Sequence, residues 1–367
     1  MNSLLKTPSG KLRARSLGVP FLGDAGVHNA ITDVPGVEVG YHTLISGADV
    51  RTGVTAILPR GRNGLGQPAA AGFHSFNGNG EMTGASWINE AGQFNSPVMI
   101  TNTHAVGPVH RGVINWMAKN KRDVIPEWLL PVVAETWDGY LNDVYGSHVT
   151  PDMAGLAIDA AKSGAVEEGS VGGGTGMNCY AFKGGCGTAS RHVSYGGKDY
   201  TVGVFLQTNF GARHELTIAG HPIGQKLLAD NPYADHYDRE GDGSCIGVLA
   251  TDAPLLSGQL QALARRLMLG LARTGTTGSH FSGDIFLAFS TANEAAFSNG
   301  YPKGGPSPLS KLDFVPWGEI NSFYAAAVYA AEEAVINSMV ANETMTGRDG
   351  HRSPSLPHEA VKALFKS

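Results

Sequence analysis

Short apolar runs, most of them bounded by glycine or polar residues, constrain the fold of this 367-residue chain more than any other feature. Each run has the length and composition of a strand that is buried on at least one face. Residues 37–45 alternate apolar and polar side chains, as expected of a half-buried strand. We predict strands at 37–45, 54–59, 97–102, 201–208, 245–251 and 284–290.

Helix signals lie between and after these strands. Thr150 has the character of an N-cap, and Gly164 is expected just past the end of the helix that it begins. Leucines recur at helical spacing between Ser257, a second expected N-cap, and Gly275. An alanine-rich stretch predicts a long third helix over residues 318–347. Because strands and helices do not alternate strictly, an α+β layered fold fits better than a doubly wound parallel sheet.

Composition excludes several classes of protein. Apolar residues make up 42% and charged residues 16%, which is typical of a globular chain. The net charge of −5 and the lack of a Lys/Arg run give no reason to expect nucleic acid as a partner. No segment approaches the ~20 apolar residues that cross a bilayer. The 50 glycines are about twice the usual share and favour tight turns and close backbone packing.

Cysteine and histidine placement favours neither a disulfide framework nor a metal site. The three cysteines form no CxxC pair, which fits a reducing compartment and predicts a cytoplasmic protein. No HExxH motif occurs, so we assign His104, His110 and His236 to structural or surface roles. We predict no catalytic metal and no cofactor.

The glycine-rich stretch 169–185 does not match a phosphate-binding loop. A Walker motif needs a lysine directly after its last glycine, but Met177 stands there and Lys183 comes too late. The stretch is better interpreted as a structural turn or as the wall of a small-molecule pocket. On the second interpretation we assign Gly173 and Gly174 to substrate binding.

One Gly-Ser dipeptide, Gly243–Ser244, stands where a polar stretch meets a predicted strand. The stretch 229–243 is expected to be an exposed loop, and the apolar run begins at once after Ser244. The chain has four Gly-Ser dipeptides, so composition alone does not single this one out. The simple interpretation is a turn into a strand. The alternative is a nucleophile that a rigid sheet aims.

Cleavage of the Gly243–Ser244 bond would give Ser244 a free α-amine with a reference pKa of ~7.7–8.0. Such an amine is a base suited to neutral pH and lies beside its own hydroxyl group. The same hydroxyl could make the cut by attacking the Gly243 carbonyl and passing through an ester. The chain has no GxSxG elbow, so an α/β-hydrolase is unsupported, while Ser-His-Asp chemistry stays open.

Longer strings of the chain resemble one known family. GSVGGGTGMNCYAFKGGCGTASR, TNFG, GDGSCIGVLATDAPL, SGDIFLAFST and TGRDGHR are similar to sequences of the L-aminopeptidase/D-esterase/D-amidase family. That family includes the β-peptidyl aminopeptidases and is related in fold to the ornithine acetyltransferases. The likeness runs from about residue 31 to the carboxyl end.

The resemblance implies a four-layer αββα sandwich, similar to N-terminal-nucleophile hydrolases but differently connected, with residues 1–367 in a single domain. It also implies a precursor that cleaves itself into segments 1–243 and 244–367. Ser244 would then be the nucleophile and its freed amine the general base. A homotetramer is the oligomeric state that the resemblance implies.

The resemblance assigns further residues. Asn209 matches a side-chain amide that contributes to an oxyanion hole, although a turn asparagine is the structural alternative. Tyr140 matches a pocket tyrosine near the scissile group, or else it is a core aromatic. Ser282 and Asp284 match a hydroxyl and a carboxylate that support the nucleophile and its amine, and their spacing puts them on one face of a strand. The β-peptide-cleaving relatives tend to carry Glu where Asp284 stands, which leaves a preference for β-peptides open.

An aminopeptidase also needs a carboxylate for the ammonium group of its substrate. Glu135 is our candidate, with Asp138 nearby. The expected substrates are small peptides, amides or esters with a free amino terminus. Two alternatives stay open: an ornithine-type acyl transferase, for which Thr rather than Ser244 would be expected, and a non-catalytic binding protein, which would remain one intact chain.

Overall fold

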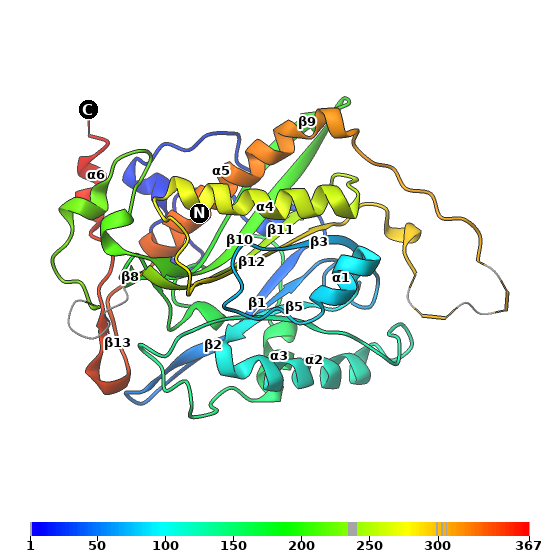
Figure 1. The fold of residues 1–367 in the computed structure, drawn as a ribbon, viewed down its shortest axis with the longest axis horizontal. Coiled ribbons are helices and arrows are strands. Elements are labelled where there is room, and N and C mark those ends of the chain that lie inside the picture. The colour runs from blue at the N-terminus through cyan, green and yellow to red at the C-terminus, as the bar shows by residue number, and fades with distance from the viewer. Residues whose placement is uncertain (1, 234–240, 299, 302–303, 306, 367) are drawn as a thin grey trace.

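The computed structural model describes the whole chain except residues 1, 234–240, 299, 302–303, 306 and 367, and describes residues 241–242 by their backbone alone. Two β-sheets lie face to face, and helices cover the outer face of each (Figure 1). The predicted loop 229–243 falls partly outside the described residues, and so does His236. The prediction is wrong for residues 241–243, which already belong to the strand that contains Ser244. No helix in the described part of the chain has the length and apolar character needed to span a membrane.

The smaller sheet has four strands in the order β1-β2-β5-β6. These strands span Glu38–Ser46, Val50–Leu58, Val98–Asn102 and Val132–Thr136. β1, β2 and β5 pair antiparallel, whereas β5 and β6 are parallel. The carboxyl ends of β5 and β6 therefore meet at one edge.

The larger sheet has six strands in the order β4-β3-β12-β11-β10-β9. In that order they span Gln93–Phe94, Ala69–Ser75, Gly283–Ser290, Gly241–Thr251, Lys198–Gly211 and Gly185–Tyr195. β11 lies in the interior of the sheet, parallel to β12 and antiparallel to β10. Two short hairpins, β7–β8 (Asn178–Cys179 and Phe182–Lys183) and β13–β14 (Met345–Thr346 and Arg352–Ser353), stand apart from both sheets.

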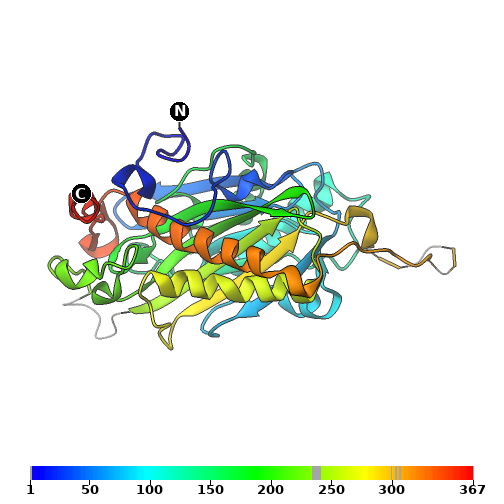
Figure 2. The same cartoon turned by 90° about the horizontal axis from the view of Figure 1, so that it is seen from above.

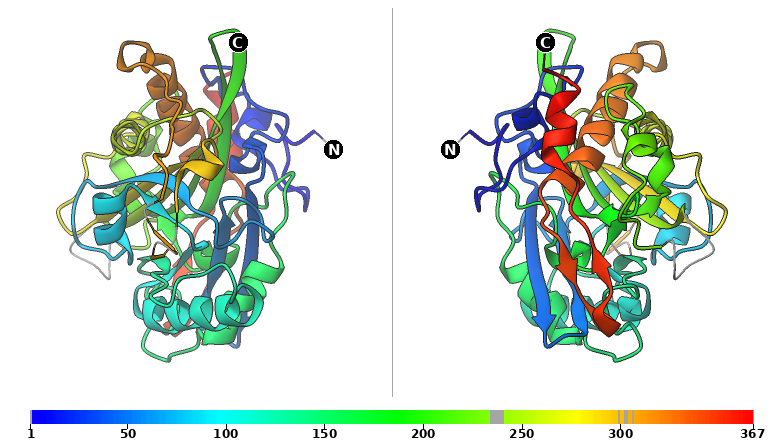
Figure 3. Two further views of the ribbon diagram at one scale, coloured as in Figure 1. Left: turned by 90° about the vertical axis from the view of Figure 1, so that its right-hand side faces the viewer. Right: turned by 90° about the vertical axis from the view of Figure 1, so that its left-hand side faces the viewer.

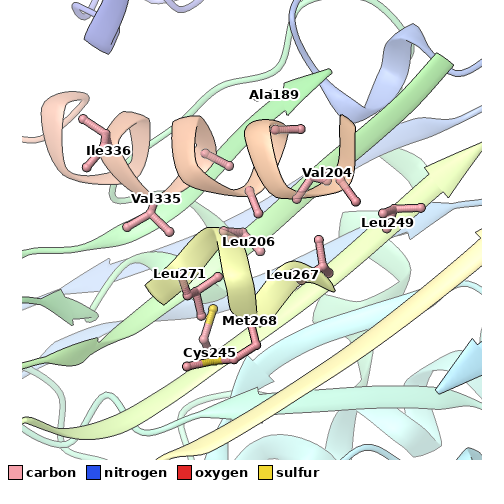
Figure 4. Close-up of a cluster of buried hydrophobic side chains, with 14 of the residues drawn as sticks. Ala189, Val204, Leu206, Cys245, Leu249, Leu267, Met268, Leu271, Val335 and Ile336 are labelled. Atoms are coloured by element: carbon pink, nitrogen blue, oxygen red, sulfur yellow. The ribbon is translucent and has the colours of Figure 1, made fainter. Parts of the chain in front are cut away.

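Three apolar clusters hold four layers together, which confirms the αββα expectation. One lies between the two sheets and includes Ile57, Phe205 and Ile246. A second joins the smaller sheet to α2 (Val106–Asn120) and α3 (Pro151–Asp159). The third joins the larger sheet to α4 (Ser257–Arg273) and α5 (Asn321–Val340), as Figure 4 shows.

Helices α4 and α5 lie side by side across the larger sheet (Figure 2). Their closeness depends on small residues, because a Cβ atom at Gly270 of α4 would lie 2.5 Å from Ala331 Cβ of α5. The shorter α-helices include α1 (Ala85–Ala91), beside β3, and α6 (His358–Ala363). α6 lies close to the amino-terminal residues, which brings the two ends of the chain to one side of the molecule (Figure 3).

All six predicted strands are present, but several limits differ. β10 extends to Gly211, so Asn209 lies within a strand and not in a turn. The sequence patterns missed β3, β4, β6, β9, the β13–β14 hairpin and the helices α1, α2 and α6.

Three predicted helix limits are wrong, and tertiary pairing explains two of them. α3 ends at Asp159 rather than near Gly164, because Lys162 pairs with Val39 at the edge of β1. α5 ends at Val340, before residues that form the β13–β14 hairpin.

The third error concerns the start of α4. Its N-cap is Leu256 rather than Ser257, and the side chain of Gln259 accepts the Leu256 N–H at 2.9 Å. A glutamine three residues on thus meets a backbone donor that the helix leaves unpaired.

Two glycines of α4 test the packing of α4 on α5. Gly270→Ala should destabilise the protein by about 1–3 kcal/mol because the added carbon meets Ala331 and the Val328 carbonyl. The matched variant Gly258→Ala should be neutral or slightly stabilising, since its Cβ would meet nothing closer than 3.8 Å. Thermal unfolding midpoints of both variants check this, and equal midpoints would contradict the packing account.

Candidate active site

Ser244 lies between two strands that define its surroundings. It pairs with Asn209 of β10 on one side and with Gly283 of β12 on the other. Ser244 is only 4% exposed. The register therefore brings together three segments that are far apart in the sequence.

The side chains of Ser244 and Asn209 share one face of the sheet. Side chains two apart on a strand point the same way, and Ile246 belongs to the cluster between the sheets. Gln207 points the same way, because its amide donates to the Thr101 carbonyl of the smaller sheet at 3.1 Å. The Ser244 hydroxyl and the Asn209 amide are thus directed into the space between the sheets.

Gly243 has no room for a side chain. A Cβ atom there would lie 1.8 Å from the Asn209 carbonyl oxygen. The β10–β11 register shifts between Asn209 and Gly211, so the backbones approach closely at this point. Any larger residue would have to displace β10, so only glycine fits directly before Ser244.

Hydrogen bonds fix the Asn209 amide at both ends. Its Oδ1 accepts the Asn178 N–H at 2.9 Å, and its Nδ2 donates to the Trp137 carbonyl at 2.9 Å. An amide NH2 group has two N–H donors. Because the group is planar, these two contacts set the direction of the second N–H.

Ser282 and Asp284 are joined directly. The Ser282 hydroxyl donates to Asp284 Oδ1 at 2.8 Å, and Asn77 Nδ2 donates to Oδ2 at 3.2 Å. Asn77 Oδ1 also accepts the Asp284 N–H at 2.6 Å. Burial raises the pKa of Asp284 to about 6, although these hydrogen bonds act in the opposite direction.

The Ser282–Asp284 pair lies on the other face of the sheet from the Ser244 side chain. Phe286, two residues beyond Asp284, belongs to the cluster against α4 and α5. The backbone N–H of Cys245 acts on the Asp284 carboxylate and lowers its pKa. The pair is therefore next to the backbone at the start of β11, rather than on the face that the Ser244 hydroxyl shares with Asn209.

Glu135, at the end of β6, lies close to the start of β12. Its Oε1 accepts the Glu81 N–H at 2.9 Å, and its Oε2 accepts the Thr103 hydroxyl. A Cβ atom at Gly80 would contact both Glu135 Oε1 and the Cα of Gly283, so the carboxylate is near the partner of Ser244. Burial raises the pKa of Glu135.

Tyr140 is buried beside Pro232 and Tyr233, which directly precede the residues that the structure does not describe. Its hydroxyl donates to the Pro232 carbonyl at 3.2 Å, and its ring packs edge-on against Tyr233. The His351 ring stacks on its other side at 4.6 Å. Tyr140 thus contacts the chain upstream of Ser244.

Gly173 and Gly174 are buried within the protein. A Cβ atom at Gly173 would lie 2.4 Å from Gln207 Oε1, and one at Gly174 would lie 2.6 Å from the Cys186 nitrogen. Both contacts are with the larger sheet, and a Cβ atom at Gly173 would also lie 2.6 Å from the Ile100 carbonyl oxygen of the smaller sheet. Their predicted part in substrate binding would therefore be indirect.

Candidate metal ligands form no cluster in the part of the chain that the structure describes. Within the described ranges, no group of three or more His, Cys, Asp or Glu side chains could hold a metal ion. His104 stacks on Tyr145 at 4.9 Å. Asp138 is fully buried, and burial raises its pKa to about 6.

Several residues of the site carry no recognisable sequence signal. Asn77 follows β3 in an Asn-Gly turn, and Asn178 and Trp137 act on Asn209 through backbone atoms. Backbone contacts of this kind depend on the fold, so the residue type does not reveal them. Asn77 is the exception, because its Asn-Gly dipeptide is a recognisable turn signal.

Comparison with known families gives one match over most of the chain. Residues 29–353 match the model of peptidase family S58. Beta-peptidyl aminopeptidase BapA of Sphingosinicella microcystinivorans is 48% identical over 372 residues, covering 96% of this chain and 92% of the relative.

Solved structures agree with the sequence comparison. The L-aminopeptidase D-Ala-esterase/amidase from Ochrobactrum anthropi superposes with a TM-score of 0.88 at 45% identity, covering 96% of this chain and 98% of that chain. It is described as a prototype for the serine aminopeptidases and a new variant of the Ntn hydrolase fold. A Burkholderia sp. beta-aminopeptidase has a TM-score of 0.89 at 42% identity, with the same coverage.

The raised pKa of Asp284 predicts how stability depends on pH. Because the native carboxyl group holds its proton up to about pH 6, whereas an unfolded Asp loses it near ~3.9, native stability falls as pH rises through this window. Asp284→Asn cannot ionise, so its unfolding midpoint relative to wild type should rise between pH 4 and pH 7.

Thermal unfolding at several pH values checks this effect. Mass spectrometry confirms that the compared samples are cut before Ser244 to the same extent. Asp123→Asn, which alters an exposed carboxylate, is the control and should show a difference that does not change with pH. A constant offset for Asp284→Asn over the same range would contradict the burial argument.

Proposed function

Because the chain belongs to peptidase family S58 and is a serine aminopeptidase of the Ntn-hydrolase-like type, we propose that Ser244 is its nucleophile and that it cuts its own Gly243–Ser244 bond. The observation that carries this proposal is the register that pairs Ser244 with both Asn209 and Gly283. The lack of space for a side chain at Gly243 supports the position of the cut.

The cut would divide one domain, residues 1–367, into segments 1–243 and 244–367. Both segments contribute strands to the larger sheet, so neither has a complete core alone. Arg213 donates to the carbonyls of Leu227, Ala229 and Asp230, and Arg352 forms an ion pair with Asp230. These contacts would hold residues 227–230 of the first segment in place after cleavage.

In the reaction that we propose, the free α-amine of Ser244 takes the proton of its own hydroxyl as the oxygen attacks the substrate carbonyl. The bond to the leaving group breaks and the protonated amine gives that group its proton. Water then hydrolyses the acyl ester and regenerates Ser244. The amine must be neutral to act as the base, and its reference pKa of ~7.7–8.0 suits this task.

The surrounding residues have distinct roles in this proposal. Asn209 donates its remaining N–H to the oxyanion, which forms only as the hydroxyl attacks. Ser282 and Asp284 lie next to the start of β11 and hold the amine rather than the hydroxyl. Tyr140 lines the approach to Ser244. Gly173 packs against the Gln207 side chain, which points to the same side of the sheet as Asn209.

Glu135 is the proposed partner of the substrate ammonium group. A buried carboxylate gains most from a charged partner, because burial weakens its interaction with water. The proposed substrates are small peptides, amides and esters with a free amino terminus. The printed names of the relatives, a β-peptidyl aminopeptidase and an L-aminopeptidase D-Ala-esterase/amidase, support this class.

A cytoplasmic homotetramer completes the proposal. The tetramer rests on the family resemblance alone. The location is supported by Cys179, Cys186 and Cys245, which are buried as free thiols.

Replacement of the nucleophile tests the cut and the chemistry together. Wild-type protein should give two polypeptides on a denaturing gel, the second of which begins SCIGVL by mass. Ser244→Ala should remain one inactive chain, whereas Ser147→Ala, at another Gly-Ser dipeptide, should be cut and active. An active, divided Ser244→Ala protein would rule out this nucleophile.

The oxyanion role of Asn209 predicts a kinetic effect. Asn209→Ala should lower kcat by about 10²–10³-fold with little change in KM, because the lost N–H bond forms only in the transition state. Steady-state hydrolysis of an aminoacyl anilide, normalised to the cut fraction, measures both constants. Asn63→Ala, at an exposed site, is the control, and an unchanged kcat in Asn209→Ala would remove Asn209 from the mechanism.

A further inference from the structure

Lys183 is a fully buried lysine in the glycine-rich stretch, at 0% exposure. It belongs to β8 and is the cross-strand partner of Asn178 in β7. Burial of a lysine is unfavourable unless its amine finds partners. The proposed chemistry gives this side chain no part, so its contacts call for a separate explanation.

The Lys183 amine bridges two backbone carbonyls. Nζ donates to the Met177 carbonyl at 2.6 Å and to the Gly184 carbonyl at 2.8 Å. The Gly184 N–H also donates to the Met177 carbonyl, at 2.9 Å. The side chain thus closes the base of the β7–β8 hairpin.

The number of N–H donors equals the number of carbonyl acceptors when the Lys183 amine is neutral. Burial lowers the pKa of Lys183 to about 7. A neutral amine retains two N–H donors, and Lys183 meets two carbonyl oxygens. Loss of the proton therefore leaves both contacts possible.

One peptide group connects this clamp to Asn209. The carbonyl of Met177 and the N–H of Asn178 belong to the same planar unit, in which they point in opposite directions. Lys183 holds the carbonyl end, while the N–H end donates to Asn209 Oδ1 at 2.9 Å. A rotation of this peptide plane would move both contacts at once.

We propose that Lys183 is a positioning residue for the oxyanion donor: by holding the Met177–Asn178 peptide plane, it fixes the direction of the Asn209 side-chain amide. The inference rests on the proposed function, in which Asn209 donates to the oxyanion. Lys183 does not touch the substrate in this account and acts only through Asn178 and Asn209.

Other contacts retain the hairpin without the lysine amine. The Asn342 side chain donates to the Gly184 carbonyl at 2.9 Å, and the Ser353 hydroxyl donates to Asn178 Oδ1. Lys183→Met fills a similar volume with an apolar side chain. We therefore expect a folded variant whose peptide plane is less well fixed.

A double-mutant cycle tests the proposal with Lys183→Met, Asn209→Ala and the double variant. Because small displacements of catalytic groups lower rates by up to ~10²-fold, Lys183→Met should lower kcat by about 10- to 100-fold with KM unchanged within about twofold. In the Asn209→Ala background, the same substitution should have no further effect on kcat. Lys198→Met, at an exposed lysine, should leave kcat unchanged.

The outcomes separate the inference from the proposed function. A wild-type kcat in Lys183→Met, or an equal loss in both backgrounds, would overturn the role of Lys183 while Asn209 keeps its own. An Asn209→Ala variant with wild-type kcat would overturn both. If Lys183→Met does not fold, Lys183→Gln serves in the same cycle, because its shorter side chain still carries two N–H donors but places them nearer the backbone of β8.

Discussion

The register of β11 between β10 and β12 is the constraint on which the rest of the site depends. It places Ser244 opposite Asn209 and beside Gly283. A slip of one residue would turn the Ser244 hydroxyl towards α4 and α5, away from the Asn209 amide. The apolar residues that follow hold this register, because Ile246 and Val248 fill the core between the sheets while Leu249 packs under the helices.

Site residues lie on both faces of the larger sheet near the start of β11. The Ser244 side chain points between the sheets, whereas Asp284 and Ser282 lie next to the backbone on the helix side. Cleavage before Ser244 would make this residue the end of the strand, so that its free amine could be reached from both faces. The buried carboxyl groups of Asp284 and Glu135, whose pKa values burial raises, lower stability at neutral pH and are the cost of this arrangement.

Sequence patterns predicted the strand after Ser244 and the shared face of Ser282 and Asp284, since both follow from local periodicity. The resemblance, rather than periodicity, singled out Asn209. Neither could reveal the Asn178 N–H, the Trp137 carbonyl or the Lys183 clamp. Asn178 and Trp137 act through backbone atoms that any residue type could supply, and the Lys183 clamp depends on how distant segments pack. The helix limits were misplaced for a similar reason, since pairing of Lys162 with β1 ends α3 early.

The identity of the acylated atom tests the central claim most directly. Rapid acid quenching during hydrolysis of an aminoacyl ester, followed by mass analysis of the digested protein, would locate the covalent intermediate. We predict one aminoacyl group on the peptide that begins at Ser244, in a chain already divided before it. An adduct on a different residue, or turnover at full rate by an undivided chain, would contradict the account.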